Sequence, residues 1–392
     1  MEHIETPISE KGIKKRVQEI LAQVQCNMFG LEEVTRLCLT ALYCGGHVLL
    51  EGNPGMGKTK LVRTLAGSLK IPYGRIQFTP DLMPTDITGS KMPDEENRAK
   101  LSFRKGPIFT SLLLADEINR ASPKTQAAML EAMGEGEVTV QGTTHSLKKP
   151  FMVLATQNPI DHDGTYPLPE AQADRFMFKL QMPYPGEQTL RKIISHNTGP
   201  QPENGDSGKT KLSEDEIKQG RAEYQYFHRD IRRVRVIPNV ETHVVNLLLA
   251  TNGRMDEMSG VGGKKQKEAA RFAEQFILFG FGPRAAESLI LGCKAYSLLF
   301  LDDRDGIAGS EPLVKIILPT LRHRLKLAFG WEERYAKMRG IHLEEDAENS
   351  ALLDTMLADL CQLVAPEDHA YENSFSRLMR AQLSPATPGG EA

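Results

Sequence analysis

The sequence has few cysteines, and none of them has a spacing typical of a disulfide framework or a zinc site. There are five, an odd number, and no two form a CxxC pair, so the pattern favours a reducing, cytoplasmic environment. No apolar run is long enough to span a bilayer, and residues 1–15 are too polar for a secretory signal. The sequence therefore argues against a secreted disulfide scaffold and against a membrane span.

A large excess of charge is also missing. The chain has 48 Lys and Arg against 51 Asp and Glu, a formal net charge of −3, so it has no bulk attraction to nucleic acid or anionic membranes. A basic run at residues 229–235 can touch nucleic acid, but no aromatic residue interleaves it, and a solvated basic face is the favoured interpretation. Nucleic acid is therefore not an expected partner. With 392 residues the chain is long enough for two domains.

The first half of the chain alternates helical patterns with short apolar runs. Residues 13–44 indicate mostly helix. Strands are predicted at residues 46–50, 75–78, 111–115, 151–156 and 176–180. Because helical patterns lie between several of these strands, the first half is predicted to be an α/β domain with a mainly parallel sheet.

Turn signals mark a helix and a hairpin in this half. Ser122 can cap a helix with Pro123 in its first turn and Gly134 just past its end. After it, alternating residues on both sides of Gly142 predict a hairpin.

The second half is predicted to be helical. A polar Gly/Pro loop at residues 198–210 precedes it, and a Pro/Gly-rich tail at the end is a candidate for disorder. Helical patterns run from about residue 212 to 335 and are clearest at residues 240–249, 265–279, 284–300 and 314–327.

The strongest motif lies between an apolar strand and an amphipathic helix. It fits G-x-x-x-x-G-K-[ST] and consists of Gly52, Asn53, Pro54, Gly55, Met56, Gly57, Lys58 and Thr59. Glycines let backbone N–H groups approach phosphate oxygens closely, and the helix that follows presents its positive end. Lys58 would contact the β- and γ-phosphates, and the Thr59 hydroxyl would bind Mg²⁺. The motif predicts a nucleoside triphosphate with Mg²⁺ as cofactor.

A second motif places two acids directly after an apolar strand. Asp116 and Glu117 would lie at the carboxyl end of that strand, where ligands bind in α/β sheets. We expect Asp116 to hold Mg²⁺ through water and Glu117 to act as the general base on the attacking water. The alternative, that both acids merely begin a loop, is weakened because they follow the motif at residues 52–59 by about sixty residues.

Three further residues are weaker candidates on pattern alone. Asn158 ends another apolar strand and could orient water or touch the γ-phosphate, although Asn-Pro is also an ordinary turn. Arg175 follows Asp174 before an apolar strand, and Arg284 lies at a helix start. Spacing alone makes each arginine an ordinary surface residue.

Four segments together resemble the MoxR family of AAA+ ATPases. They are residues 46–59 (GHVLLEGNPGMGKT), 114–133 (LADEINRASPKTQAAMLEAM), 154–160 (LATQNPI) and 164–176 (GTYPLPEAQADRF). The match runs nearly unbroken from about residue 29 to 185, with the motifs agreeing in order and spacing. Residues 252–282 depart from the family pattern.

The resemblance implies a fold and a set of site residues. The fold would be an α/β P-loop core with a mainly parallel five-stranded sheet, followed by a smaller all-helical lid. ATP would be the nucleotide, hydrolysed with Mg²⁺. Asn158 matches sensor 1, Arg284 matches sensor 2, and Arg175 matches the arginine finger that reaches the neighbouring subunit's nucleotide. Phe29 and Gly30 would line the adenine pocket.

The resemblance also implies the domain organisation. Residues 1–190 would form the core, 191–220 a linker, 221–335 the lid and 336–392 a C-terminal extension. Within the core, residues 86–107 resemble an insert in helix 2 and residues 137–148 a hairpin before sensor 1. In the family such inserts face the ring pore or the partner.

The expected function is that of a cytoplasmic, chaperone-like ATPase. Identical subunits would form a ring, expected to be a hexamer, and remodel a client, for which a von Willebrand factor A domain protein is one candidate. Three alternatives stay open: a motor subunit like that of magnesium chelatase, a DNA-acting motor, and a nucleotide-gated scaffold with little turnover. Asp161, His162 and Asp163 could ligate a metal, but a charged loop is the favoured interpretation.

Overall fold

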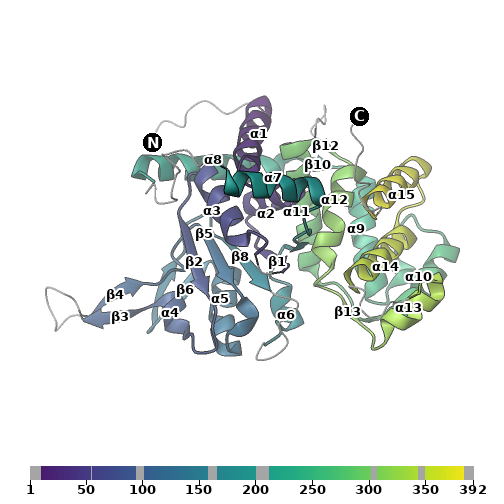
Figure 1. Cartoon of the computed structure of the whole chain (residues 1–392). Helices are drawn as coiled ribbons and strands as arrows, with labels where there is room; N and C mark the ends of the chain where they lie inside the picture. Colours follow the sequence, from purple (N-terminus) through teal and green to yellow (C-terminus); the bar gives the residue numbers. More distant parts are fainter. Residues whose placement is uncertain are drawn as a thin grey trace. The chain divides into compact units, whose positions relative to one another are not determined.

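The computed structural model describes residues 10–53, 55–93, 101–157, 166–199, 212–301, 307–342 and 349–383 (Figure 1). The chain divides into two compact units. The first comprises Met1–Phe176 and Leu180–Asp230, and the second comprises Met177–Lys179 and Ile231–Ala392. No helix in the described ranges is long and apolar enough to cross a membrane.

The first unit is built on a five-stranded sheet. Its order is β2 (Tyr73–Gln77), β5 (Leu112–Asp116), β8 (Met152–Gln157), β1 (Val48–Glu51) and β9 (Phe178–Gln181). The pairs β2–β5, β5–β8 and β8–β1 are all parallel. The central strands are buried along nearly their whole length, which explains why they appear in the sequence as continuous apolar runs. The predicted mainly parallel five-stranded sheet is confirmed.

Eight helices of the described residues belong wholly or mainly to the first unit. They are α1 (Glu10–Gln25), α2 (Glu32–Cys44), α3 (Lys58–Ser68), α4 (Pro84–Thr88), α5 (Pro123–Glu135), α6 (Glu170–Ala173), α7 (Glu187–Thr198) and α8 (Glu214–Arg233). Helix α3 buries one stripe of apolar residues, Leu61, Val62, Leu65 and Ala66, as its sequence period predicts.

The ends of α5 differ in detail from the prediction. Ser122 is the N-cap by position, but its hydroxyl makes no capping bond and lies 3.1 Å from the Thr125 hydroxyl instead. The helix runs through Gly134, where an end was predicted, and stops at Glu135. Gly136 then adopts the left-handed conformation (φ 68°) that favours glycine at a helix C-terminus. With two glycines two residues apart, the sequence offers two stops, and the structure uses the second.

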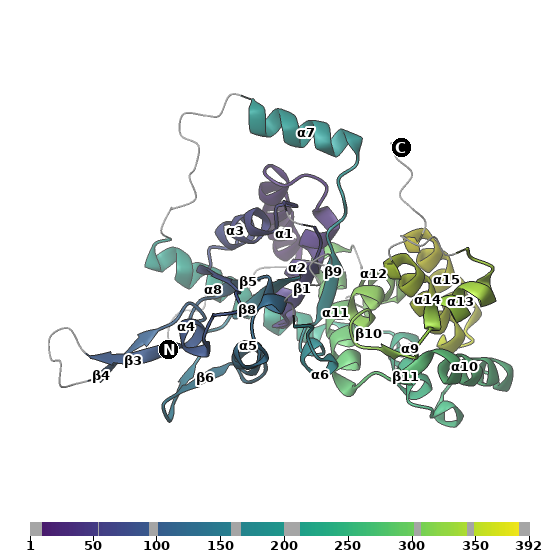
Figure 2. The same ribbon diagram turned by 60° about the horizontal axis from the view of Figure 1, so that its bottom comes forward.

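Two hairpins extend from the first unit. Strands β3 (Gly89–Pro93) and β4 (Leu101–Lys105) form one, and β6 (Glu137–Val140) and β7 (Thr143–Ser146) form the other. Gln141 (φ 47°) and Gly142 (φ 77°) both have positive φ in the second hairpin, as a tight two-residue turn requires, so this predicted hairpin is confirmed. Figure 1 and Figure 2 both show β3 and β4 projecting away from the sheet.

Aromatic stacking joins the two hairpins. The ring of Phe103 on β4 lies flat on the ring of His145 on β7, with centroids 4.0 Å apart. Phe109 meets Phe103 edge to face at 5.6 Å, and Lys91 donates a 3.4 Å hydrogen bond to the Thr143 hydroxyl. The hairpins therefore pack as one body.

The second unit is mostly helical. It contains α9 (Pro238–Thr251), α10 (Gly263–Phe276), α11 (Pro283–Phe300), α12 (Ser310–Leu321), α13 (Trp331–Arg339), α14 (Asn349–Val364) and α15 (His369–Leu383). Two short ladders pair β10 (Arg235–Val236) with β12 (Ile307–Ala308) and β11 (Ile277–Phe279) with β13 (Lys326–Leu327).

The β11–β13 ladder corrects two predicted helices. Patterns at 265–279 and 314–327 predicted helix to Phe279 and Leu327, but α10 ends at Phe276 and α12 ends at Leu321. The residues beyond these ends pair with each other, Ile277 with Leu327, antiparallel. A strand of two or three residues carries no readable alternation, so sequence periodicity alone could not separate it from the helix before it.

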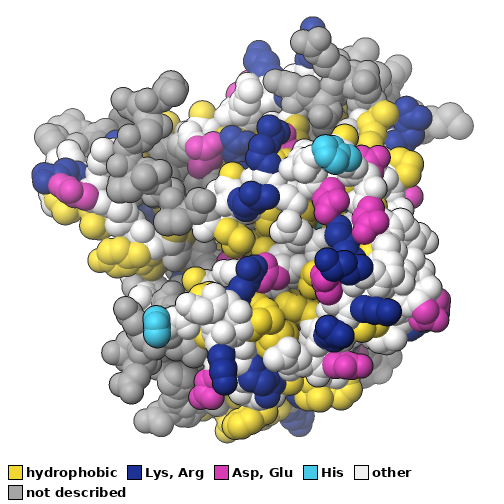
Figure 3. All heavy atoms as spheres, turned by 90° about the vertical axis from the view of Figure 1, so that its right-hand side faces the viewer, with side chains coloured by type: hydrophobic (Ala, Val, Ile, Leu, Met, Phe, Trp, Pro, Cys, Tyr) yellow, Lys and Arg dark blue, Asp and Glu magenta, His cyan; other side chains and the backbone are white. Residues whose placement is uncertain are grey.

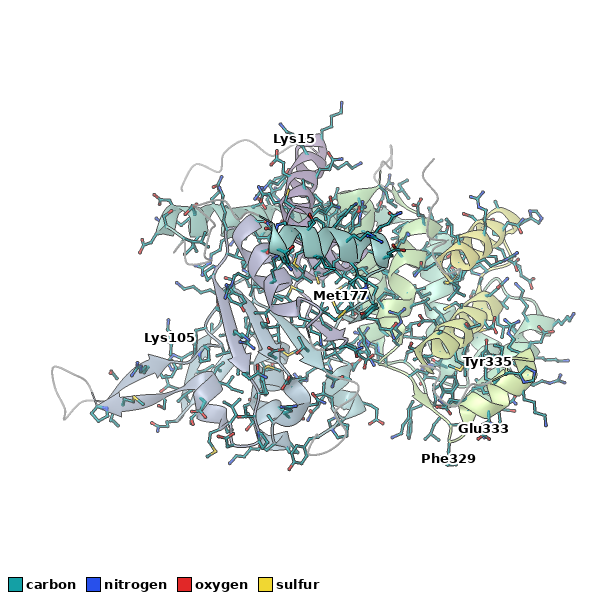
Figure 4. The ribbon with its side chains drawn as sticks, in the orientation of Figure 1. Lys15, Lys105, Met177, Phe329, Glu333 and Tyr335 are labelled. Carbon is teal, nitrogen blue, oxygen red and sulfur yellow. The ribbon has the colours of Figure 1, made fainter. Side chains whose placement is uncertain are left out.

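Oppositely charged side chains within the second unit form ion pairs with each other. Arg322 and Asp354 form a 2.6 Å ion pair, and Lys265 and Glu372 form another at 2.6 Å. Figure 3 shows Lys and Arg side chains interspersed with Asp and Glu on the face it presents. One large apolar side chain is also on the surface: Phe329, just before α13, is 99% exposed (Figure 4).

Each unit contains one buried histidine that bridges segments distant in sequence. His47 accepts the Val153 N–H at Nδ1 (3.0 Å), so its Nε2–H donates to the Met133 carbonyl at 3.1 Å. His243 likewise lies between the Tyr371 hydroxyl and the Cys361 carbonyl, at 2.9 and 2.8 Å. Burial lowers the pKa of each histidine to about 4, although a backbone hydrogen bond opposes the shift.

The lowered pKa of these histidines predicts that the folded state is destabilised at acid pH. Since the pKa of His47 is lowered in the folded state, its stabilising contribution is present above pH 6.5 and is lost as the pH falls toward 4. At pH 5 the loss should be about 2 kcal/mol relative to pH 7. Urea unfolding at pH 7 and pH 5 measures it. His47→Gln, which keeps a donor and an acceptor but does not titrate, should show a pH dependence smaller by that amount. An unchanged pH dependence would contradict the assignment.

Candidate functional site

The glycine-rich loop connects β1 to α3 at the edge of the parallel sheet. Gly55 (φ 80°) and Gly57 (φ 78°) are both left-handed, which turns successive N–H groups toward the loop interior. A Cβ at Gly52 would lie 2.7 Å from the Cβ of Met182, so the loop also needs glycine there for space. The loop begins α3 at Lys58 and Thr59, as predicted. Pro54 lies outside the described residues.

Lys58 extends across this loop. Its ammonium donates to the Gly52 carbonyl and, at 3.4 Å, to the Gln157 carbonyl at the end of β8. Burial lowers the pKa of Lys58, while the carboxylates of Asp116, Glu117 and Glu51 raise it. The half-buried ammonium is held in place by two carbonyl groups, with carboxylates near enough to act on it electrostatically. It is suited to receive phosphate oxygens, and this fit supports a triphosphate at the loop.

Asp116 ends β5 beside the loop, and both of its carboxylate oxygens have partners. Oδ1 accepts a 2.7 Å hydrogen bond from the Thr156 hydroxyl. Oδ2 forms a 2.6 Å ion pair with Arg75 Nη2, which also donates to Gln77 at 2.7 Å. The carboxylate is only slightly exposed, at 16%, whereas the Arg75 side chain is 46% exposed. An oxygen ligand suitable for Mg²⁺ is thus present, with a cation from the chain beside it.

Glu117 lies immediately after the strand in a left-handed conformation (φ 56°, ψ 51°). Few residues other than glycine adopt it, and such residues gather at functional sites. Its carboxylate forms a 3.1 Å ion pair with Arg120 in the following 3-10 turn, η1 (Ile118–Arg120). The side chain of Gln126 secures that turn with bonds to the Ile118 and Ala121 carbonyls at 3.1 and 3.2 Å.

The other predicted site residues are placed as follows. Asn158 lies outside the described residues. Arg175 lies in the first unit, just after α6, where its Nη1 donates a 2.8 Å hydrogen bond to the Leu130 carbonyl of α5. A Cβ at Gly134 would come within 1.9 Å of the same nitrogen, so the guanidinium rests directly on the α5 backbone. Arg284 is the second residue of α11, in the second unit.

A pocket of about 460 Å³ adjoins the glycine-rich loop. Met28, Phe29 and Gly30 line it together with Gly55–Gly57 of the loop. Thr189, Ile193 and Asn197 of α7 also line it, and the Phe29 ring meets the His196 ring edge to face at 5.6 Å. Such a mixture of apolar and polar lining groups suits a nucleotide base, and the role of Phe29 and Gly30 in holding adenine stays a prediction. The contribution of α7 was not predicted.

Sequence reasoning also missed the residues that hold the two acids. Thr156, Arg75 and Arg120 were not singled out, although all three contact Asp116 or Glu117. Thr156 is a polar residue in an otherwise apolar buried strand, which was a usable signal. Arg75 becomes a neighbour only through the β2–β5 pairing, which the sequence does not show directly.

A glycine-rich loop beside paired acids on a parallel sheet of this strand order indicates a class as well as a fold. The model of one family, described as "ATPase family associated with various cellular activities (AAA)", matches residues 47–178. This range spans the loop, both acids and the two hairpins. The molecule is an AAA+ P-loop protein.

Relatives that match most of the chain identify the family within this class. The chain is 36% identical to Chaperone MoxR1 of Mycobacterium tuberculosis, over 83% of this chain and 81% of that one. It is 37% identical to the uncharacterized protein YeaC of Bacillus subtilis, over 81% and 87% respectively. The crystal structure of a proposed ATPase from Cytophaga hutchinsonii superposes with a TM-score of 0.69 at 29% identity, covering 89% of this chain and 95% of that one. The chain belongs to the MoxR family of AAA+ ATPases.

Proposed function

We propose that this protein hydrolyses ATP in a ring of identical subunits and uses the energy to remodel a client protein. The observation that carries the proposal is the convergence of Lys58, Asp116 and Glu117. The Lys58 ammonium lies within the electrostatic reach of both carboxylates, at the mouth of a loop whose glycines turn N–H groups inward. This arrangement suits a triphosphate with a bound divalent cation. Membership of the AAA family supports it.

Each residue of the site has a role in this proposal. The backbone N–H groups of the non-proline residues in the 52–59 loop would bind the phosphates, and Lys58 would neutralise the β- and γ-phosphates. Thr59 and Asp116 would hold Mg²⁺, which supplies positive charge to the phosphate oxygens. Both Asp116 oxygens are engaged in the structure, so the exposed Arg75 would give way while the buried Thr156 stays.

Hydrolysis then needs one proton transfer at Glu117. The carboxylate accepts a proton from water as the water oxygen bonds to the γ-phosphorus. The bond from that phosphorus to the bridging oxygen breaks, and ADP leaves with its electron pair. Glu117 must first leave Arg120, and this ion pair is weak because the two side chains are 31% and 44% exposed.

Three further residues complete the proposed site. Asn158 would orient the attacking water, and Arg284 would contact the γ-phosphate from the helical unit. Arg175 would enter the neighbouring subunit's site, which would make the site complete only in an oligomer. We take a hexamer as the expected ring. The paired hairpins of residues 89–105 and 137–146 are the proposed contact with the client or the ring pore.

The client is proposed by class only. One relative is named a chaperone, which supports protein remodelling. We propose the cytoplasm as the compartment and a von Willebrand factor A domain protein as one candidate client. Among the alternatives, a motor for metal insertion would need a metal-loading complex for full turnover. A DNA-acting motor would be stimulated by single-stranded DNA, and a nucleotide-gated scaffold would turn over little with or without a partner.

Lys58→Ala tests the nucleotide site. The variant should lose nearly all ATP affinity, because Lys58 is the cation proposed to contact the β- and γ-phosphates. Titration of a fluorescent ATP analogue measures the affinity. Lys15→Ala, on an exposed residue of α1 (Figure 4), is the matched control and should bind like the wild type. Wild-type affinity in Lys58→Ala would refute the site.

A further inference from the structure

Thr156 on β8 touches both acids of the site at once. Its hydroxyl donates a 2.7 Å hydrogen bond to Asp116 Oδ1 and accepts a 2.9 Å hydrogen bond from the Glu117 backbone N–H. The residue is 1% exposed, so water does not compete for these bonds. One side chain therefore uses its single donor and one acceptor to fix the positions of two neighbouring residues.

The bond to Glu117 lies where the sheet pairing stops. The paired residues of β5 and β8 end with Ala115 opposite Ala155. Two residues on, Glu117 lies beyond the last paired residue of this ladder and adopts the left-handed conformation, so its N–H needs an acceptor outside the ladder. Thr156 supplies that acceptor. Without the Thr156 hydroxyl, the Glu117 N–H would lose its acceptor, and the left-handed conformation that directs the Glu117 side chain would lose this support.

The bond to Asp116 fixes one carboxylate oxygen and leaves the other exchangeable. Oδ2 pairs with Arg75, whose side chain is nearly half exposed, so solvent can replace this ion pair at a low cost. Oδ1 pairs with Thr156, which the buried strand holds in place. The carboxylate can thus change its partner at one oxygen without rotating at the other, as an outer-shell hydrogen bond achieves for a metal-binding carboxylate.

We propose that Thr156 is a positioning residue for ATP hydrolysis, holding Asp116 ready for Mg²⁺ and Glu117 ready for water. The inference rests on the proposed ATPase function. A purely structural hydroxyl would stabilise the strand without altering how the site responds to Mg²⁺. The two roles therefore separate in measurements that compare Mg²⁺-dependent and Mg²⁺-independent behaviour.

The experiment compares four variants of the full chain with the wild type. Thr156→Val keeps the shape and removes the hydroxyl, Thr156→Ala removes both, and Thr156→Ser keeps the hydroxyl. Thr40→Val is the matched control, since Thr40 is fully buried on α2 and its hydroxyl donates to the Arg36 carbonyl of its own helix, at 2.9 Å. Each variant is assayed for turnover, for melting temperature, and for binding of a fluorescent nonhydrolysable ATP analogue with Mg²⁺ and with EDTA.

We expect the hydroxyl to decide the outcome. Thr156→Val should lose about 10- to 100-fold in turnover, the range found for outer-shell partners of metal ligands. The affinity gain on adding Mg²⁺ should shrink by a similar factor, while the affinity in EDTA stays at the wild-type value. Thr156→Ser should restore most of both, and Thr40→Val should change neither.

The results separate the two proposals. If the wild type binds the analogue but never hydrolyses ATP under any tested condition, the ATPase function fails, while the Mg²⁺ dependence of binding still tests Thr156. If the wild type turns over and both Thr156→Val and Thr156→Ala match Thr40→Val, the positioning role is refuted. If Thr156→Val does not fold, Thr156→Ala provides the same comparison. Failure of Thr156→Ser to restore the Mg²⁺ response would also overturn the role.

Discussion

Glu117→Gln should lower ATP turnover by about 10²- to 10⁴-fold, the usual contribution of a general base, while ATP still binds. The amide cannot accept the proton of the attacking water, but it keeps the size of the carboxylate. The backbone bond from the Glu117 N–H to Thr156 is unaffected, so the left-handed turn should persist. Steady-state phosphate release measures turnover, and analogue titration measures binding.

The control for this variant is Glu131→Gln. Glu131 lies on the exposed side of α5, outside the proposed site, and its substitution removes the same charge. It should turn over like the wild type. If Glu117→Gln also kept normal turnover, another base would have to be sought. Since the variant should retain bound ATP, it is also the form in which to capture the client.

Arg175→Ala should bind ATP normally and lose about 10³- to 10⁵-fold in turnover, the range for an arginine finger supplied by a neighbouring subunit. The structure adds a complication, because the Arg175 side chain donates to the Leu130 carbonyl of its own α5. Removing it could therefore disturb the subunit that carries it. A melting-temperature comparison with the wild type shows whether it does.

Mixing subunits separates the two explanations. If the proposal holds, Lys58→Ala subunits should not bind ATP, but they keep Arg175 and should be able to supply it to a neighbour. Mixed with Arg175→Ala subunits, they should restore part of the activity, although each variant alone is inactive. A local folding defect in Arg175→Ala would not be repaired in this way. Absence of any recovery, with mixed oligomers verified by size, would argue against a shared site.

The sequence predicted the sheet and the two main motifs well. The central strands β1, β5 and β8 are buried on both faces and so appear as apolar runs, and the motif at residues 52–59 has the strand and helix that its chemistry requires. Asp116 and Glu117 follow the expected strand for the same reason. These features depend on short segments of the chain, which is the scale at which residue patterns are informative.

Features that depend on pairing between distant segments were not predictable. Arg75 reaches Asp116 because β2 pairs with β5, and Thr156 reaches Glu117 because β8 ends beside β5. The β11–β13 ladder was assigned to two helices for a similar reason, since Ile277 and Leu327 lie 50 positions apart and only the fold brings them together.

The stacked rings of Phe103 and His145 have a practical consequence for protein engineering. The Phe103 and His145 rings cover each other, so shortening either hairpin would expose the aromatic ring of the other to solvent. Chimeras that test the hairpins as the proposed client contact should therefore transplant both hairpins together. Exchanging a single hairpin would leave rings that do not pack at the contact between the two hairpins, and the exposed aromatic surface would favour aggregation.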